Sequence, residues 1–165
     1  MAGGDAVDRM VGEWTRRDPE LDVSPFEVVG RLLLCADHCH RAIASVLRTL
    51  GLSYGDFDVI NTLRRRGDPQ GTNPRELARS SLITSGAMTS RLDRLEQAGL
   101  IARSADPADR RGVLVRLTGQ GESLAEQAVR AVLEVDEAFL EPLGRRQRDT
   151  VAAALKQLLV RYEPG

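Results

Sequence analysis

The sequence predicts a mainly α-helical protein with one small β-hairpin, organised as a winged helix-turn-helix flanked by N- and C-terminal dimerisation helices. Apolar residues recur at helical spacing through most of the chain, and a polar-faced helix that ends at Gly99 is followed at once by two strand-like segments. The 165 residues suffice for one compact unit with helical extensions. We expect N-terminal helices in 1–52, a winged helix-turn-helix lobe in 53–118 and C-terminal dimerisation helices in 119–165.

The first part should contain two helices. Apolar residues at helical spacing in 7–14 predict a short amphipathic helix, which the Asp-Pro pair at 18–19 ends. The segment Ser-Pro-Phe-Glu at 24–27 resembles a capping box with proline at the first helical position, and it opens a long helix that stops at Gly51. One face of that helix is a near-heptad apolar seam suited to helix–helix association: Val28, Leu32, Cys35, Cys39, Ile43, Val46 and Leu50.

The central part should begin with two helices. Ser53 starts the first, whose apolar residues Phe57, Ile60 and Leu63 face inward and whose last turn is rich in arginine. The Asn-Pro pair at 73–74 caps a second helix of about two turns.

A third helix, from about Thr84 to Ala98, ends at a glycine that favours a C-terminal cap. Strand-like residues at 100–104 and 113–118 then predict a hairpin around a charged turn. In the last part, Thr118 begins a long helix to about residue 140, and a final helix starts at Arg145.

Charge is segregated along the chain. The net charge is -1 and the pI about 6.1, but residues 61–116 hold 11 Arg against 6 Asp and Glu, a local balance of +5 that leaves -6 for the remainder. A basic lobe on an acidic scaffold is typical of a DNA-binding protein.

The third helix has two distinct faces. Met88, Leu92 and Leu95 share a core-facing stripe, whereas the residues that point away from it include small hydroxyl side chains able to approach base edges. Two adjacent arginines at the hairpin tip repel each other unless an anionic partner is present, and an arginine oriented by a carboxylate suits the narrow minor groove. The expected DNA-binding residues are Thr84, Ser85, Gly86, Thr89, Ser90, Arg94, Asp109, Arg110 and Arg111. A plain surface helix and a solvated charged turn are the alternatives.

The string Cys-Ala-Asp-His-Cys-His at 35–40 admits two interpretations. Cys35 and Cys39 fall on the apolar seam, where cysteine acts as a small hydrophobe. The chain has only these two Cys and two His residues, so a structural zinc site would need a dimer to complete it. Core packing is the favoured interpretation, and thiol or metal sensing is the alternative.

Several classes of protein find no support. The N-terminus lacks the pattern of a signal peptide and no apolar run reaches the ~18 residues needed to span a bilayer, so we expect a cytoplasmic protein that binds no membrane. No phosphate loop or nucleophile elbow occurs, so we expect neither an enzyme nor a cofactor.

From about Ser53 to Gly121 the chain resembles the MarR family of winged-helix transcriptional regulators. The resemblance is carried by SGAMTSRLDRLEQAGLI, by DPADRRGVLVRLT and by Gly121. The family's wing signature is Asp, any residue, Arg, five residues, then Leu-Thr, and Asp109, Arg111, Leu117 and Thr118 stand at that spacing. The resemblance implies a homodimer joined through its terminal helices, with Arg111 in the minor groove and Asp109 orienting it.

A narrower resemblance, carried by the extra N-terminal helix and by PELDVSPFEVVGRLL, is to the urate-responsive branch of that family. It implies that Trp14 and Arg91 hold an anionic purine, and that Asp58 and Arg103 relay its arrival to the DNA-reading helix. Stacking on Trp14 and bidentate pairing with Arg91 are physically sound, and helical counting places Arg91 at the junction with the element behind its helix. A structural salt bridge at Arg91 and a hydrophobic anchor at Trp14 are the alternatives. The same counting places Asp58 toward solvent unless another helix covers it.

Together these observations predict a repressor that binds a palindromic operator as a homodimer and is released by a small anionic aromatic ligand such as urate. A thiol- or metal-responsive regulator using Cys35 and Cys39 is one alternative, and a helical interaction module that binds no DNA is another.

Overall fold

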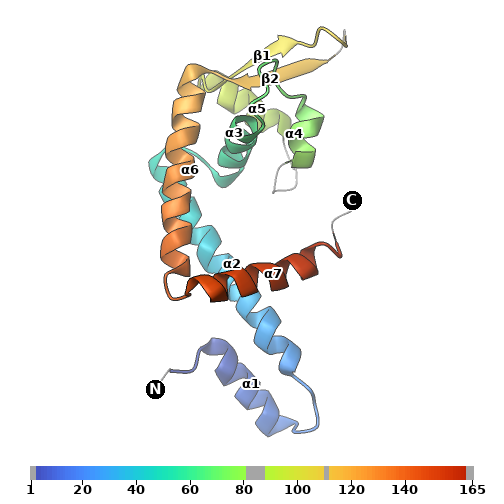
Figure 1. The fold of residues 1–165 in the computed structure, drawn as a ribbon, viewed down its shortest axis with the longest axis vertical. Coiled ribbons are helices and arrows are strands. Elements are labelled where there is room, and N and C mark those ends of the chain that lie inside the picture. Colours follow the sequence, from blue (N-terminus) through green and yellow to red (C-terminus); the bar gives the residue numbers. More distant parts are fainter. Residues whose placement is uncertain (1–2, 81–87, 110–111, 163–165) are drawn as a thin grey trace. The chain divides into compact units, whose positions relative to one another are not determined.

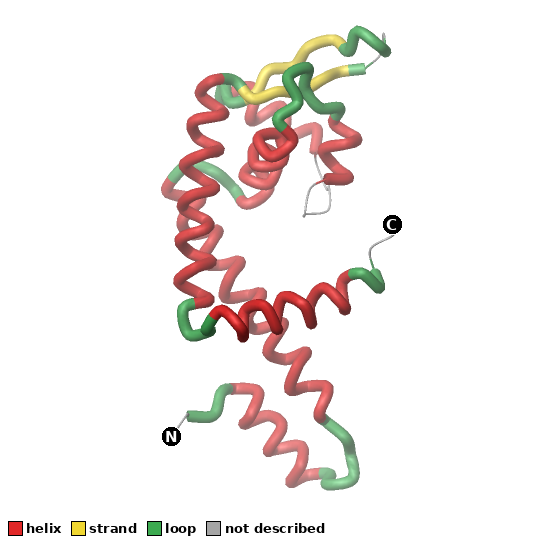
Figure 2. The backbone as a smooth tube through the Cα atoms, viewed as in Figure 1, coloured by secondary structure: helices red, strands yellow, loops and turns green. Residues whose placement is uncertain are grey.

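The structure is a computed structural model that describes residues 3–80, 88–109 and 112–162. The described elements follow the predicted order of helices around one hairpin, so the expected fold class is confirmed (Figures 1 and 2). They are α1 (Ala6–Arg17), α2 (Ser24–Thr49), α3 (Tyr54–Arg66), α4 (Pro74–Ser80), α5 (Met88–Gln97), β1 (Ile101–Ala105), β2 (Val113–Leu117), α6 (Gly119–Leu140) and α7 (Arg145–Leu159). The chain divides into two compact units, Met1–Ala42 and Ile43–Gly165, with the boundary inside α2.

In the first unit, α1 is fastened to the early turns of α2. Asp5 and Asp8 form a capping box at the start of α1, and both carboxylates also accept hydrogen bonds from Arg31 of α2, at 2.8 Å and 2.5 Å. Val7 is buried where α2 carries Gly30, and a methyl group on that glycine would lie 3.2 Å from the valine side chain. These contacts hold the N-terminal half of the helix that carries the only tryptophan.

The start of α2 differs slightly from the prediction. The helix includes Ser24 as its first residue instead of using it as the cap. The carboxylate of Asp22 accepts the N–H of Ser24 at 3.0 Å, which satisfies one of the amide groups that a helix start leaves without a partner. An aspartate two residues earlier therefore takes the role predicted for the serine.

The second unit is built around a core shared by α3, α5, α6 and the hairpin. The strands pair antiparallel with Ile101 opposite Leu117, and the loop before α4 adds a short bridge between Thr72 and Val115. The three short helices lie beneath the hairpin, beside the long α6 (Figure 1). The core residues with the least exposure include Leu47, Val59, Ile60, Leu77, Val115, Ala125 and Ala128.

The junction between α5, the hairpin and α6 is tightly built. Gly99 ends α5 with a left-handed φ of 71°, the conformation for which a glycine cap is suited. Thr118 then caps α6 by accepting the N–H of Gly121 at 3.0 Å, and its hydroxyl donates to the carbonyl of Gly99 at 2.7 Å. One threonine thus joins the end of the α5 turn to the start of α6.

Gly121→Ala should be strongly destabilising. A methyl group at this position would lie 1.9 Å from the carbonyl oxygen of Leu100, so the first turn of α6 would have to move away from β1. Overpacking of this kind costs about 1–3 kcal/mol or more, and a backbone atom cannot swing aside. Thermal unfolding of the variant measures the effect. Gly119→Ala is the matched control, because nothing lies within 4 Å of its added methyl group; equal stability of the two variants would contradict the close packing.

Candidate nucleic-acid interface and effector residues

The two faces of α5 are as the helical count predicts. Leu92 and Leu95 are buried and Met88 is partly buried against the same core, whereas Thr89 and Ser90 are exposed. Three further residues expected to contact DNA, Thr84, Ser85 and Gly86, lie outside the described residues. Within the described part of the helix, short hydroxyl side chains are therefore presented on the surface while leucines anchor the helix below.

Arg94 has a structural partner that the sequence did not reveal. Its guanidinium donates to the carboxylate of Asp56 at 2.5 Å, and Asp56 also accepts from Ser53 in the capping box of α3. Burial alone would raise the pKa of Asp56, but the hydrogen bonds from Arg94 and Ser53 outweigh it and lower the pKa overall. Asp56 is only 5% exposed, so the ion pair ties α5 to the first turn of α3.

Arg91 lies at the junction between α5 and α3, the place indicated by helical counting. Its Nε stands 2.5 Å from the point where a Cβ of Gly55 would be. Arg91 forms no ion pair with any residue that the structure describes. The side chain is partly buried against α3, and its charge is not matched by a described carboxylate.

Arg103 connects the hairpin to the helix before it. From β1 its guanidinium pairs with Asp93 at 2.7 Å and with Glu96 at 3.3 Å, both on α5. The arginine is 27% exposed, and its two partners stand three residues apart on one face of the helix. A displacement of Arg103 would therefore act on α5 and on the hairpin together.

Helical counting left Asp58 facing solvent unless another helix covered it, and the residue is in fact only 5% exposed. Helix α6 packs along α3, which is the helical cover that counting along one element cannot foresee. Tyr54 lies near both Asp58 and Asp136 of α6: burial raises the pKa of the tyrosine hydroxyl and the two carboxylates raise it further. Burial likewise raises the pKa of Asp136. Two acidic side chains and a phenol thus lie close together between α3 and α6.

Hydrogen bonds join the described residues on the two sides of the hairpin tip. Gly112 donates to the carbonyl of Asp109 at 2.8 Å, and the carbonyl of Gly112 accepts from Asp106 at 3.0 Å. The carboxylate of Asp106 also accepts the N–H of Ala108 at 2.9 Å. Asp109 is exposed, and the two tip arginines, Arg110 and Arg111, lie outside the described residues.

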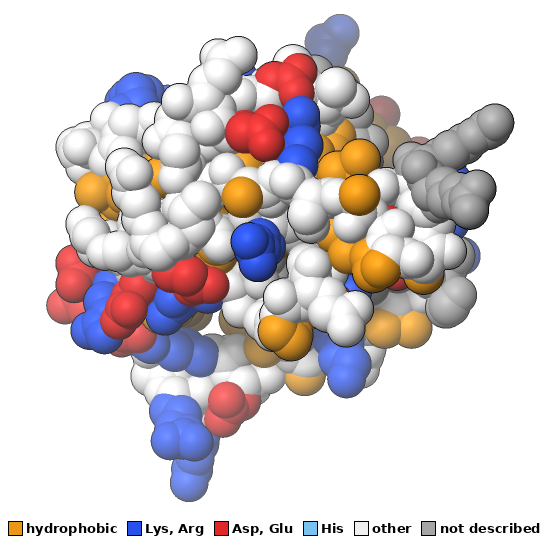
Figure 3. Space-filling model, turned by 90° about the horizontal axis from the view of Figure 1, so that it is seen from above, with side chains coloured by type: hydrophobic (Ala, Val, Ile, Leu, Met, Phe, Trp, Pro, Cys, Tyr) orange, Lys and Arg blue, Asp and Glu red, His pale blue; other side chains and the backbone are white. Residues whose placement is uncertain are grey.

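Part of the basic charge of the lobe is matched by acidic side chains. On the face seen in Figure 3, basic side chains stand beside acidic and apolar ones. Ion pairs explain part of this: Arg64 pairs with Glu122 at 2.8 Å and Arg66 pairs with Glu76 at 3.0 Å. The arginines that form no ion pair with a described carboxylate therefore matter more for DNA binding than the net charge of residues 61–116.

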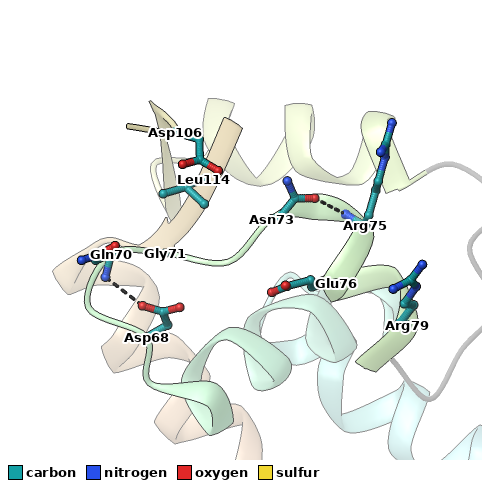
Figure 4. A pocket seen from close by; sticks show the side chains of 9 residues that line it. All are labelled: Asp68, Gln70, Gly71, Asn73, Arg75, Glu76, Arg79, Asp106 and Leu114. Atoms are coloured by element: carbon teal, nitrogen blue, oxygen red, sulfur yellow. Dashed lines mark hydrogen bonds between the residues drawn. The ribbon is translucent and has the colours of Figure 1, made fainter. Parts of the chain in front are cut away.

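Two such arginines, Arg75 and Arg79 on α4, were missed in the sequence. Both are exposed, and neither forms an ion pair with a residue in the described ranges. They line a polar hollow of about 480 Å³, and Figure 4 shows them extending from α4 on the side away from Asp68 and Asp106. Their spacing of four residues on a helix was the signal that could have found them.

Two candidate residues of the first unit, Trp14 and Cys35, are exposed in the single chain. Trp14 is 42% exposed and lies with Glu13 and Arg17 around a shallow hollow of about 290 Å³. Cys35 is exposed and Cys39 is partly buried, so the core packing predicted for the cysteines is not found for Cys35 within one chain. Among the described residues, no group of three or more Cys, His, Asp or Glu side chains could hold a metal ion.

None of the described helices combines the length and the apolar character that crossing a membrane demands.

Comparison with known proteins places the chain in one family. A model of the MarR family matches residues 52–113. The transcriptional regulator PecS of Dickeya dadantii is 36% identical over 149 residues, which cover 90% of each chain. The multiple antibiotic resistance protein MarR of Salmonella typhimurium is 35% identical over 100 residues, which cover 60% of this chain and 67% of that protein.

A solved structure also has the same fold as this chain. A MarR variant from E. coli in complex with operator DNA superposes with a TM-score of 0.70 at 27% identity, covering 88% of this chain and 97% of that one. The polar face of α5, the hairpin that follows it and these similarities agree with one another. The chain belongs to the MarR family of winged helix-turn-helix transcriptional regulators and is not an enzyme.

Proposed function

We propose that this regulator is a repressor that binds a palindromic operator as a homodimer and leaves it when a small anionic aromatic ligand binds. The observation that carries the DNA-binding part is the exposed hydroxyl face of α5, joined without a break to the hairpin. An α-helix fits the major groove, and a two-stranded wing reaches the neighbouring minor groove. The operator-bound MarR structure with the same fold supports this assignment.

The proposed DNA contacts fall into two groups. Thr89 and Ser90, with Thr84, Ser85 and Gly86, would approach bases and phosphates in the major groove. Asp109, Arg110 and Arg111 would act in the minor groove, with the aspartate orienting an arginine. We assign Arg94 a different role from the one expected, because its pairing with Asp56 suits the positioning of α5 better than a base contact.

The terminal helices support a dimer. Helix α7 has no buried residue in the single chain, although leucine and valine side chains recur along it. Such an uncovered apolar face is unusual on a monomer and favours association. We therefore propose that the segments 1–52 and 119–165 join two copies, and that 53–118 binds DNA. The proposed interface includes exposed apolar residues of α2, α6 and α7: Val28, Leu33, Leu34, Leu133, Val151, Leu158 and Leu159.

The proposed effector site uses an accessible aromatic ring and an arginine whose charge is not matched by a described carboxylate. Trp14 would stack on a planar anion and Arg91 would pair with its charge. Arg103 would transmit the effect of ligand binding to the hairpin, because it already connects β1 to α5. Asp58, buried beside Tyr54, would sense the same change from within α3. A regulated release follows if the ligand favours a dimer whose half-site spacing does not match the operator.

Replacing Arg75 and Arg79 together with alanine should reduce the salt dependence of DNA binding. If each contacts a phosphate in both protomers, four contacts disappear, and the slope of log K against log salt should fall by about 3.6. Filter binding or anisotropy between low and moderate salt measures the slope. Arg130→Ala is the control, because that exposed arginine lies on α6 and pairs with Glu126. An unchanged slope in the double variant would remove α4 from the proposed interface.

Urate should quench the fluorescence of Trp14 and release the operator at millimolar concentration or below. Trp14 is the only tryptophan, so its emission reports the proposed site without a background. Trp14→Phe should keep DNA binding while weakening the urate response, since phenylalanine offers a smaller ring than tryptophan for stacking. If urate quenches the fluorescence but does not release the operator, it binds the protein without acting as its effector. If urate does neither, it is excluded as the effector. Oxidants and chelators serve as controls, because an effect of either would instead favour Cys35 and Cys39.

A further inference from the structure

Gly55, in the first turn of α3, occupies a position where its backbone does not require glycine. It is buried and helical, and it is not among the glycines with positive φ. Alanine is preferred over glycine within a helix, so this residue weakens the helix that contains it. A need for space, not a need for backbone freedom, accounts for the missing side chain.

The space is taken by the guanidinium of Arg91. A methyl group at Gly55 would lie 2.5 Å from Nε, 2.6 Å from Cζ and 2.8 Å from the terminal Nη2 of that arginine. All three distances are too short for a carbon atom to fit, so the guanidinium, the flexible end of the Arg91 side chain, would have to move. Any side chain at this position would therefore push the arginine away from α3.

The neighbouring arginine shows what distinguishes Arg91. Arg94 stands one turn later on α5 and is held by the carboxylate of Asp56, the residue directly after Gly55. Arg91 faces the glycine instead and has no ion pair with the residues that the structure describes. Two adjacent positions of α3 thus receive two arginines of α5, and only one of these arginines is neutralised. The other, Arg91, is partly buried, and no described carboxylate forms an ion pair with it.

We propose that Gly55 is a positioning residue for the effector site: its missing side chain seats the guanidinium of Arg91 on the first turn of α3, where the charge stays available to an anionic ligand. The inference rests on the proposed role of Arg91 in binding the effector. It adds that the specificity of the site depends on a residue that does not touch the ligand.

Gly55→Ala tests the proposal through the response to urate. The variant should need about tenfold more urate, or higher, for half-release of the operator, the loss expected when a charge-assisted hydrogen bond is misplaced. Its operator affinity should stay within about threefold of the parent, because the displaced guanidinium is not one of the proposed DNA contacts. Gly119→Ala, whose added methyl group meets nothing, is the matched control and should respond to urate as the parent does.

A double-mutant cycle with Arg91→Ala distinguishes the contact between Gly55 and Arg91 from a general effect of Gly55→Ala on folding. In the Arg91→Ala background, Gly55→Ala should raise the melting temperature, because alanine favours the helix and nothing is displaced. With Arg91 present, the same substitution should give a smaller rise or a fall. An identical change in melting temperature in both backgrounds would show that Gly55 does not position Arg91, even if Gly55→Ala alone folds poorly.

The two proposals fail in different ways. If Arg91→Ala still releases DNA normally with urate, the effector role of Arg91 is wrong, whatever the cycle shows. If Arg91→Ala loses the response while Gly55→Ala keeps it at the parental urate concentration, the effector role stands and the positioning role of Gly55 is wrong.

Discussion

Arg111→Ala should lower operator affinity by roughly two to four orders of magnitude while the protein keeps its fold and its dimeric state. A base or groove contact of this kind contributes about 1–3 kcal/mol, and a symmetric dimer loses two of them at once. The prediction rests on the wing signature formed with Asp109, Leu117 and Thr118, and on the backbone hydrogen bond that Gly112 donates to Asp109 beside the tip.

The lysine variant sharpens the test. Arg111→Lys keeps the charge but loses the planar group that fits a narrow groove, so its affinity should lie between that of the parent and that of the alanine variant. Arg116→Ala provides a control on β2, outside the tip. Titration of labelled operator at fixed salt gives the affinities, and circular dichroism checks the fold. Parental affinity in Arg111→Ala would refute the assignment of the wing.

A double substitution in α7, Leu158→Asp with Leu159→Asp, should separate the dimer and thereby abolish tight operator binding. The two leucines are 48% and 56% exposed in the single chain, and no residue of α7 is buried there. Two aspartates in a covered apolar interface cost several kcal/mol per protomer, whereas on a free surface they would be nearly neutral. Operator affinity should fall more than about 100-fold, because a monomer can engage only one half-site.

Sedimentation or light scattering measures the mass of the species, and operator titration measures the functional consequence. Gln157→Asp introduces one negative charge directly before Leu158 and should leave the dimer intact. A double variant that remains dimeric would show that α7 is not part of the interface. Loss of DNA binding without loss of the dimer would instead point to a change in the reading lobe.

The fold could be predicted from sequence because its signals are local. Caps at Ser53 and Thr118, the glycine stop at Gly99 and the strand-like residues of the hairpin each depend on a few neighbouring residues. The core stripe of α5 follows from helical geometry in the same way. These features do not depend on which distant segment packs against them.

The side-chain partners could not be predicted, because they join distant elements. Counting along α3 alone could not show that α6 covers Asp58. Counting along α5 alone marked Arg94 as outward and free, but the carboxylate that holds it is 38 residues earlier in the chain. The contact of Arg91 with Gly55 depends on the same packing of α5 on α3, and no local sequence pattern predicts it.

The most direct test of the central claim is selection of duplexes from a randomised pool by the purified full-length protein. The proposed homodimer should enrich an inverted repeat whose half-sites are centred about one helical turn, roughly 10–10.5 base pairs, apart, and urate should release the selected duplex. Binding should also weaken steeply as salt rises. A pool that remains without an inverted repeat after repeated rounds, with no salt-dependent affinity, would contradict the proposal that this protein is a DNA-binding homodimer.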